Sequence, residues 1–197
     1  MLADEDGLRV LAPDAPGHGA SARLPADGYL PSRLARIAAS LLDARGVREA
    51  VCGGFGWGTS IACNFGAAYP QRTRALVLIE PGILDSHDDA SFGDRALEDL
   101  VGERGLDGAL HWALWREPIT STYPALRHHG LPVLLVTDTR EHYRESLGFD
   151  PVERVRHEVP QAEVREVVSR HGHDLLAHDA RNVARIIGDW LAARDLI

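Results

Sequence analysis

Cysteine, positive charge and long apolar runs are all scarce in this chain of 197 residues. Its two cysteines are too few for a disulfide framework, which agrees with a reducing compartment and predicts a cytoplasmic protein. A formal net charge of −8 argues against nucleic acid or an anionic membrane as a partner. No apolar run reaches the length of a membrane span, and Met1 is followed by acidic residues rather than by a signal peptide.

The remaining composition is that of an ordinary globular protein. Hydrophobic residues make up 45% of the chain and charged residues 25%. The length suffices for one domain with a sizeable core, and neither an internal repeat nor a low-complexity linker divides it. We therefore expect a single domain over residues 1–197.

One glycine-rich stretch, residues 51–60, organises the chain. An apolar run ends at Cys52, a tight turn follows, and a helical pattern begins at Thr59. Strand, turn and helix form the context of a nucleophile elbow, G-x-Nuc-x-G, and residues 54–58 supply its outer glycines. The nucleophile position is occupied by Gly56, which fits the bend because glycine enters positive φ at little steric cost. The alternative is a turn that is rich in glycine for packing alone.

Short apolar runs alternate with helical patterns along the rest of the chain. Ser32 is predicted to cap a helix that ends at Gly46, and Asp179 is predicted to cap the last helix. Strands that alternate with helices indicate a parallel α/β sheet with right-handed crossovers and helices on both faces. The predicted strands cover residues 8–12, 49–52, 76–79, 131–136 and 162–168.

Residues 83–128 differ from this alternation because they contain no predicted strand. They hold acidic clusters and then several aromatic residues, including Trp112 and Trp115. We expect a helical insertion that acts as a lid. Trp112 and Trp115 are three residues apart and share a helix face, so they either line a pocket under the lid or pack the insertion's own core.

Five segments of the chain carry family-like motifs in a fixed order: residues 14–21 (D-x-P-G-x-G-x-S), 54–58 (the elbow), 69–78 (an approach to a strand), 131–136 (a strand before an acid) and 172–173 (G-H). In this order the motifs resemble the α/β-hydrolase superfamily over nearly the whole chain except the insertion. Trp57, directly after the elbow centre, is similar to the G-x-D-W-G of the epoxide hydrolase and haloalkane dehalogenase branch.

The resemblance implies a histidine oriented by a carboxylate. Carried over by position, the histidine is His173, with His171 as a less favoured substitute. Two acids stay open: Glu141, which stands at the usual acid position and is slightly favoured, and Glu80, which follows the strand at 76–79 as in some dehalogenases. Asp138 stands where the family pattern has glycine. The backbone N–H of Trp57 would polarise a carbonyl.

The sequence departs from the family in two ways. Gly56 cannot be a nucleophile, and family members usually carry further strands before the one at 8–12. We expect an α/β-hydrolase sheet without those N-terminal strands, open between residues 8–12 and 49–52. Such a chain would be marginally stable, or would associate as a homo-oligomer or with a strand-donating partner.

We therefore expect an α/β-hydrolase-family protein that acts on a small organic molecule, with His173 and a carboxylate as general base and no covalent nucleophile. If it is an enzyme, it is a hydrolase or a non-covalent, lyase-like relative. Two alternatives stay open: a non-catalytic binding protein, and a true hydrolase whose nucleophile has been changed to glycine. No cofactor is expected, and the spacing of His171, His173 and His178 matches no standard zinc pattern.

Overall fold

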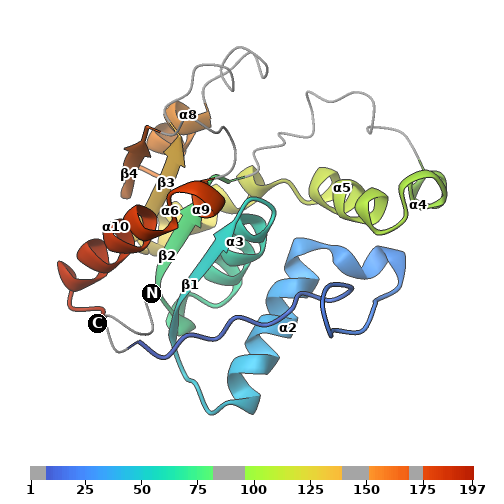
Figure 1. Ribbon diagram of the computed structural model, residues 1–197, viewed down its shortest axis with the longest axis horizontal. Coiled ribbons are helices and arrows are strands. Elements are labelled where there is room, and N and C mark those ends of the chain that lie inside the picture. Colours follow the sequence, from blue (N-terminus) through green and yellow to red (C-terminus); the bar gives the residue numbers. More distant parts are fainter. Residues whose placement is uncertain (1–7, 82–95, 139–150, 169–174) are drawn as a thin grey trace.

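The computed structural model describes residues 8–81, 96–138, 151–168 and 175–197 (Figure 1). Four parallel strands form one sheet in the order β1-β2-β3-β4. This confirms the predicted parallel α/β sheet and four of the five expected strands. The strands are β1 (Ala50–Phe55), β2 (Thr73–Ile79), β3 (Val133–Asp138) and β4 (Ala162–Val167).

The sheet is apolar on both faces because successive side chains of a strand point in opposite directions. In β2, Leu76 and Leu78 belong to one buried cluster, whereas Ala75 and Val77 belong to another. Strand β3 divides in the same way between the two clusters. Continuous apolar runs are therefore required here, as in other parallel sheets that helices cover on both faces.

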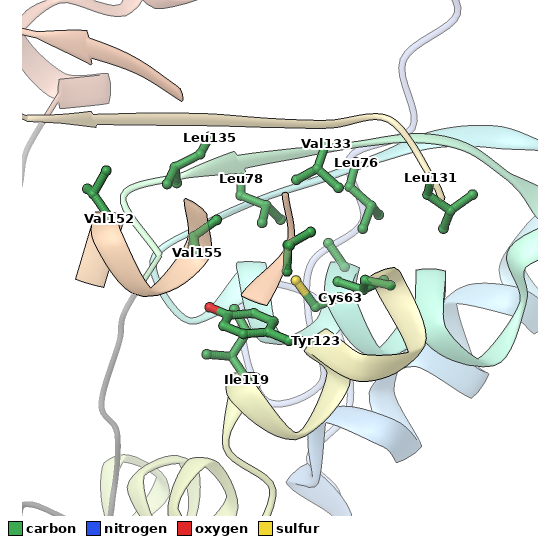
Figure 2. Close-up of a cluster of buried hydrophobic side chains, with 13 residues drawn as sticks. Cys63, Leu76, Leu78, Ile119, Tyr123, Leu131, Val133, Leu135, Val152 and Val155 are labelled. Atoms are coloured by element: carbon green, nitrogen blue, oxygen red, sulfur yellow. The ribbon is translucent and has the colours of Figure 1, made fainter. Parts of the chain in front are cut away.

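One face of the sheet is covered by helices from three parts of the chain (Figure 2). Cys63, Tyr123 and Val155 lie in this cluster and come from three different helices. The elements are α3 (Gly58–Ala68), η3 (Ile119–Thr122), α6 (Tyr123–His129) and α8 (Pro151–Glu158).

The other face is covered by α9 (Leu175–His178) and α10 (Ala180–Ala192). The predicted apolar face of the last helix is confirmed, since Val183, Ile187 and Trp190 are buried against the sheet. Asp179 is at the N-cap position as expected. Its carboxylate accepts a hydrogen bond from the Asn182 side chain at 2.9 Å rather than from a backbone N–H.

The remaining helices lie outside these two layers. Helix α2 (Pro31–Ala44) packs on α3. It is followed by a Schellman motif, in which Gly46 has positive φ and Val47 N–H donates to Leu42 O at 2.8 Å. No helix in the described part of the chain is long and apolar enough to cross a membrane. Short η2 (Pro70–Arg72) precedes β2, while η1 (Ala26–Tyr29), α4 (Leu97–Arg104) and α5 (Leu106–Arg116) pack together.

The predicted strand at residues 8–12 is wrong. This segment is extended but belongs to no strand, and the only described strand paired with β1 is β2. Leu8 packs against the cluster beneath α10, and Leu11 packs against the cluster between α2 and α3. Leu8 and Leu11 are therefore partly buried at the edge of the sheet, near β1, whereas Val10 between them is 54% exposed (Figure 1).

The predicted helix cap at Ser32 is also wrong. Leu30 is the N-cap of α2, and Pro31 and Ser32 are already helical. Ser32 instead donates two hydrogen bonds to the Glu117 carboxylate, from its backbone N–H and from Oγ, each 2.8 Å long. Because Glu117 follows the last residue of α5, this contact joins the end of α5 to the start of α2.

Candidate functional site

Gly56 lies in the tight turn between β1 and α3, at the carboxyl end of the sheet. Its φ of 52° is in the left-handed region, and its N–H donates to Ile79 O at 3.0 Å. A Cβ on Gly54 would overlap the backbone of Gly58, so the strand and the helix approach as closely as the glycine frame suggests. The turn thus has the shape of an elbow with no side chain at its centre.

Four oxygen or sulfur atoms near this turn could be considered as nucleophiles. Thr59 Oγ1 donates to Gly56 O at 2.6 Å, which commits it to the backbone. Ser60 is fully buried, and its Oγ has no hydrogen-bond partner among the described residues, hence no base there to activate it. Burial raises the pKa of the Cys52 thiol to about 12, against the opposing effect of Arg72. Burial likewise raises the pKa of the Cys63 thiol to about 12, so little thiolate exists near pH 7.

Glu80 is the most unusual residue beside the elbow. It follows β2 directly, is only 3% exposed and has a φ of 42°, which L side chains rarely adopt. Its N–H donates to Val136 O at 2.8 Å, and its Oε2 accepts the N–H of Leu175 at 3.3 Å. A buried carboxylate on a strained backbone at the end of a parallel strand is typical of a functional site.

Asp138 provides a second buried carboxylate at the same edge of the sheet. It ends β3, the neighbour of β2, and is 8% exposed. The sequence pattern treated this position only as a replaced glycine. The sequence signal was an acidic residue two positions after the last residue of a buried apolar run, Val136.

The loop at residues 14–21 brings a histidine to the elbow that the sequence analysis did not select. The His18 ring lies nearly parallel to the Trp57 ring, with 6.5 Å between centroids and 28° between planes. The loop is held by its own hydrogen bonds, among them Ala20 N–H to Asp14 Oδ2 at 2.8 Å and Ser21 Oγ to Asp14 O at 2.7 Å. An aromatic pair therefore lies directly beside Gly56.

Two predicted site residues, Glu141 and His173, lie outside the described residues, as does His171. Trp112 packs against the apolar cluster that joins η1, α4 and α5, which supports its role in the core of the insertion. Trp115 is half-buried, and the Arg116 guanidinium lies 5.8 Å from the ring centroids of both tryptophans. Among the residues that the structure describes, no group of His, Cys, Asp and Glu side chains could hold a metal ion.

Sequence similarity to known hydrolases covers part of the chain. A segment of 76 residues, 39% of this chain, is 37% identical to 2-hydroxy-6-oxo-6-phenylhexa-2,4-dienoate hydrolase of Burkholderia cepacia and spans 27% of that protein. A segment of 72 residues, 36% of this chain, is 40% identical to 2-hydroxymuconate semialdehyde hydrolase of Pseudomonas putida and spans 25% of it. The match thus extends over about a quarter of the length of these curated relatives.

Solved structures match the chain more widely. A meta-cleavage product hydrolase superposes with a TM-score of 0.63, covering 92% of this chain and 79% of that structure, at 15% sequence identity. This likeness concerns the fold alone. The family model for the alpha/beta hydrolase fold matches residues 2–102, just over half of the chain, and that interval includes the His18 loop, the elbow and Glu80. The chain therefore belongs to the α/β-hydrolase fold family.

Proposed function

We propose that this protein hydrolyses a small organic molecule, an ester, an epoxide or a related compound, by general-base catalysis without a covalent nucleophile. The observation that carries this proposal is Glu80. A buried carboxylate held at positive φ beside the elbow costs stability, so a chemical role is its best explanation.

Glu80 is also well placed in the sequence to orient His173. Its Oε2 accepts the N–H of Leu175, which is two residues beyond His173 in the chain. A carboxylate that accepts the imidazole N–H fixes the tautomer of the ring and stabilises the imidazolium that forms during catalysis. This favours Glu80 over Glu141 as the orienting acid, a reversal of the preference drawn from the sequence.

The proposed reaction on an ester begins with a water molecule between His173 and the substrate carbonyl. His173 takes a proton from water, and the water oxygen bonds to the carbonyl carbon. The carbonyl oxygen becomes an oxyanion that accepts a hydrogen bond from the backbone N–H of Trp57 at the elbow. The tetrahedral intermediate then collapses, and the alkoxide leaves with the proton from His173.

The names of the relatives indicate which compounds to include beside simple esters and epoxides. Those names describe hydrolases of hydroxy-oxo-dienoates and of a hydroxymuconate semialdehyde. We propose that small molecules with hydroxyl and oxo groups belong to the substrate class of this chain as well.

The proposal is tested by a panel of esters, epoxides, haloalkanes and hydroxy-oxo acids on the chain and on Gly56→Ser and Gly56→Asp. We expect slow turnover by the parent chain. Gly56→Ser should hydrolyse esters at least about tenfold faster, because a covalent nucleophile divides the reaction into two easier steps. Serine at φ 52° costs about 1–2 kcal/mol of stability, so folding of the variant is checked by circular dichroism.

Gly53→Ser is the matched control, because it adds the same side chain to β1, where a Cβ has ordinary van der Waals contacts, 3.4 Å from Val77 O. It should leave the parent rate unchanged. The proposal would be contradicted if the parent chain binds panel compounds and neither it nor Gly56→Ser turns any of them over. That result would favour a binding protein. An inactive parent with an active Gly56→Ser would favour a hydrolase whose nucleophile has been replaced.

A further inference from the structure

We propose that His18 is a substrate-binding residue whose Nε2 accepts a hydrogen bond from a hydroxyl group on the substrate, while the faces of His18 and Trp57 form an apolar wall beside Gly56. This inference rests on the proposed function and deepens it by naming the chemical group that the site recognises.

The one described hydrogen bond of the His18 ring indicates its tautomer. Nδ1 lies 3.2 Å from the carbonyl oxygen of Pro16. A carbonyl oxygen only accepts hydrogen bonds, so Nδ1 is the donor, and in the tautomer that has its proton on Nδ1 the other nitrogen, Nε2, is an acceptor. No residue in the described ranges hydrogen-bonds to Nε2, and the His18 side chain is exposed. A ligand at the elbow can therefore reach this nitrogen.

The loop that carries His18 is held from several sides. Its backbone is closed by hydrogen bonds from His18 N–H to Ala15 O at 2.9 Å and from Ser21 N–H to His18 O at 3.0 Å. A Cβ on Gly17, whose φ is 80°, would lie 2.8 Å from the Tyr29 hydroxyl and 3.1 Å from the Leu106 side chain. The loop is thus packed closely against η1 and the first residue of α5, so its backbone is in place before a ligand binds, and the contact between Nδ1 and Pro16 O orients the ring.

The Trp57 ring supplies the apolar part of the site. Trp57 directly follows Gly56, and a planar His18 ring at 6.5 Å adds a second flat surface. Flat surfaces favour a planar, conjugated or aromatic substrate, and the single acceptor at Nε2 favours one that carries a hydroxyl. Both features lie on the described residues and are independent of His173.

The test compares two fluorinated fragments that differ by one group, 4-fluorophenol and 4-fluorotoluene, by ligand-detected fluorine NMR. The variant His18→Phe keeps a flat ring next to Trp57 and removes Nε2. We expect 4-fluorophenol to bind the parent chain about three- to tenfold more tightly than His18→Phe, the range of one hydrogen bond. The affinity of 4-fluorotoluene should be equal for both.

His157→Phe is the matched control, because His157 is an exposed histidine on α8. It should bind both fragments as the parent does. Equal binding of 4-fluorophenol to the parent and to His18→Phe would overturn the inference, as would a parent that binds neither fragment. Fragment binding requires no turnover. A chain that hydrolyses no compound but loses affinity for 4-fluorophenol in His18→Phe would contradict the proposed function and support this inference.

Discussion

Gly56 and Glu80 are neighbours through the backbone, and both have positive φ. Gly56 donates to the carbonyl oxygen of Ile79, the residue before Glu80, so one hydrogen bond joins the two strained positions. At position 56 glycine adopts positive φ with little steric strain. At position 80 a glutamate adopts it, which costs about 1–2 kcal/mol of stability because the residue has a Cβ. Backbone geometry favours glycine at position 80, so the choice of glutamate is best explained by its carboxylate.

The two thiols provide a prediction at the same scale. Burial raises the pKa of Cys52 and of Cys63 to about 12. At pH 8 the folded chain should therefore react with 5,5′-dithiobis(2-nitrobenzoate) at least about a hundredfold more slowly than the unfolded chain, because the thiolate is the reacting form. The measurement is the rate of colour release at pH 8, with and without guanidinium.

Complete unfolding is the control and should release both thiols.

The sign of the pH effect on stability follows from the same shifts. The folded state keeps these protons up to a pH of about 12, whereas the unfolded chain loses them near pH 9. Their contribution to stability is present below pH 9 and is lost as the pH rises toward 12. Labelling of the folded chain at the rate of free cysteine would contradict the burial of Cys63 and the partial burial of Cys52.

At the scale of elements, local apolar runs predicted the strands that helices cover on both faces. Residues 76–79 and 131–136 are continuous apolar runs. The first lies within β2 and the second overlaps β3 from Val133 onward, and both strands are buried in the centre of the sheet. Residues 8–12 are apolar except for Arg9, but Leu8 and Leu11 pack against two different clusters without joining the sheet. Composition alone does not distinguish these two kinds of burial.

Part of the site could not be predicted because its contacts connect distant residues. His18 was treated as part of a turn, since nothing in its local sequence points to Trp57, 39 positions later. The partner of Ser32 is 85 positions away, so the local pattern favoured Ser32 itself as the cap. Gly56 was found because the elbow is a local motif, readable from five consecutive residues.

The contact between Glu117 and Ser32 gives a prediction about the insertion. The Glu117 carboxylate accepts two hydrogen bonds at the N-terminus of α2, where the helix dipole also favours negative charge. We expect Glu117→Gln and Ser32→Ala each to lower the free energy of unfolding by about 1 kcal/mol, as the loss of a helix cap does. For a domain of this size, the melting temperature should fall by about 2–4 °C.

The control is Glu98→Gln, the same chemical change at an exposed position in the first turn of α4. Glu98→Gln loses the helix-dipole interaction but not the hydrogen bonds with Ser32, so it should lower the melting temperature less than Glu117→Gln does. Limited proteolysis adds a local measurement, because loss of the contact should speed cleavage within α4 and α5 more than elsewhere. Variants as stable and as protease-resistant as the parent would show that the contact adds nothing to the attachment of α5.

At the scale of the whole molecule, β1 is the edge of the described sheet and the strand that carries the elbow. Gly53 is exposed, and Phe55 is 37% exposed, whereas β2 is buried along most of its length. Val10, in the segment near this edge, is 54% exposed. Unpaired backbone groups and apolar side chains on a sheet edge form a template for strand addition.

We propose that two copies of the chain associate through the β1 edge and the neighbouring residues 8–12. Size-exclusion chromatography with light scattering should then show a mass that rises with protein concentration toward that of a dimer. Val10→Glu should shift the equilibrium toward monomer, because a charge at the edge opposes pairing. Ile37→Glu, at an apolar side chain on α2 that is similarly exposed, is the matched control and should leave the mass unchanged. A monomer at all concentrations, with one cooperative unfolding transition well above about 65 °C, would mean that the edge is stable as it stands.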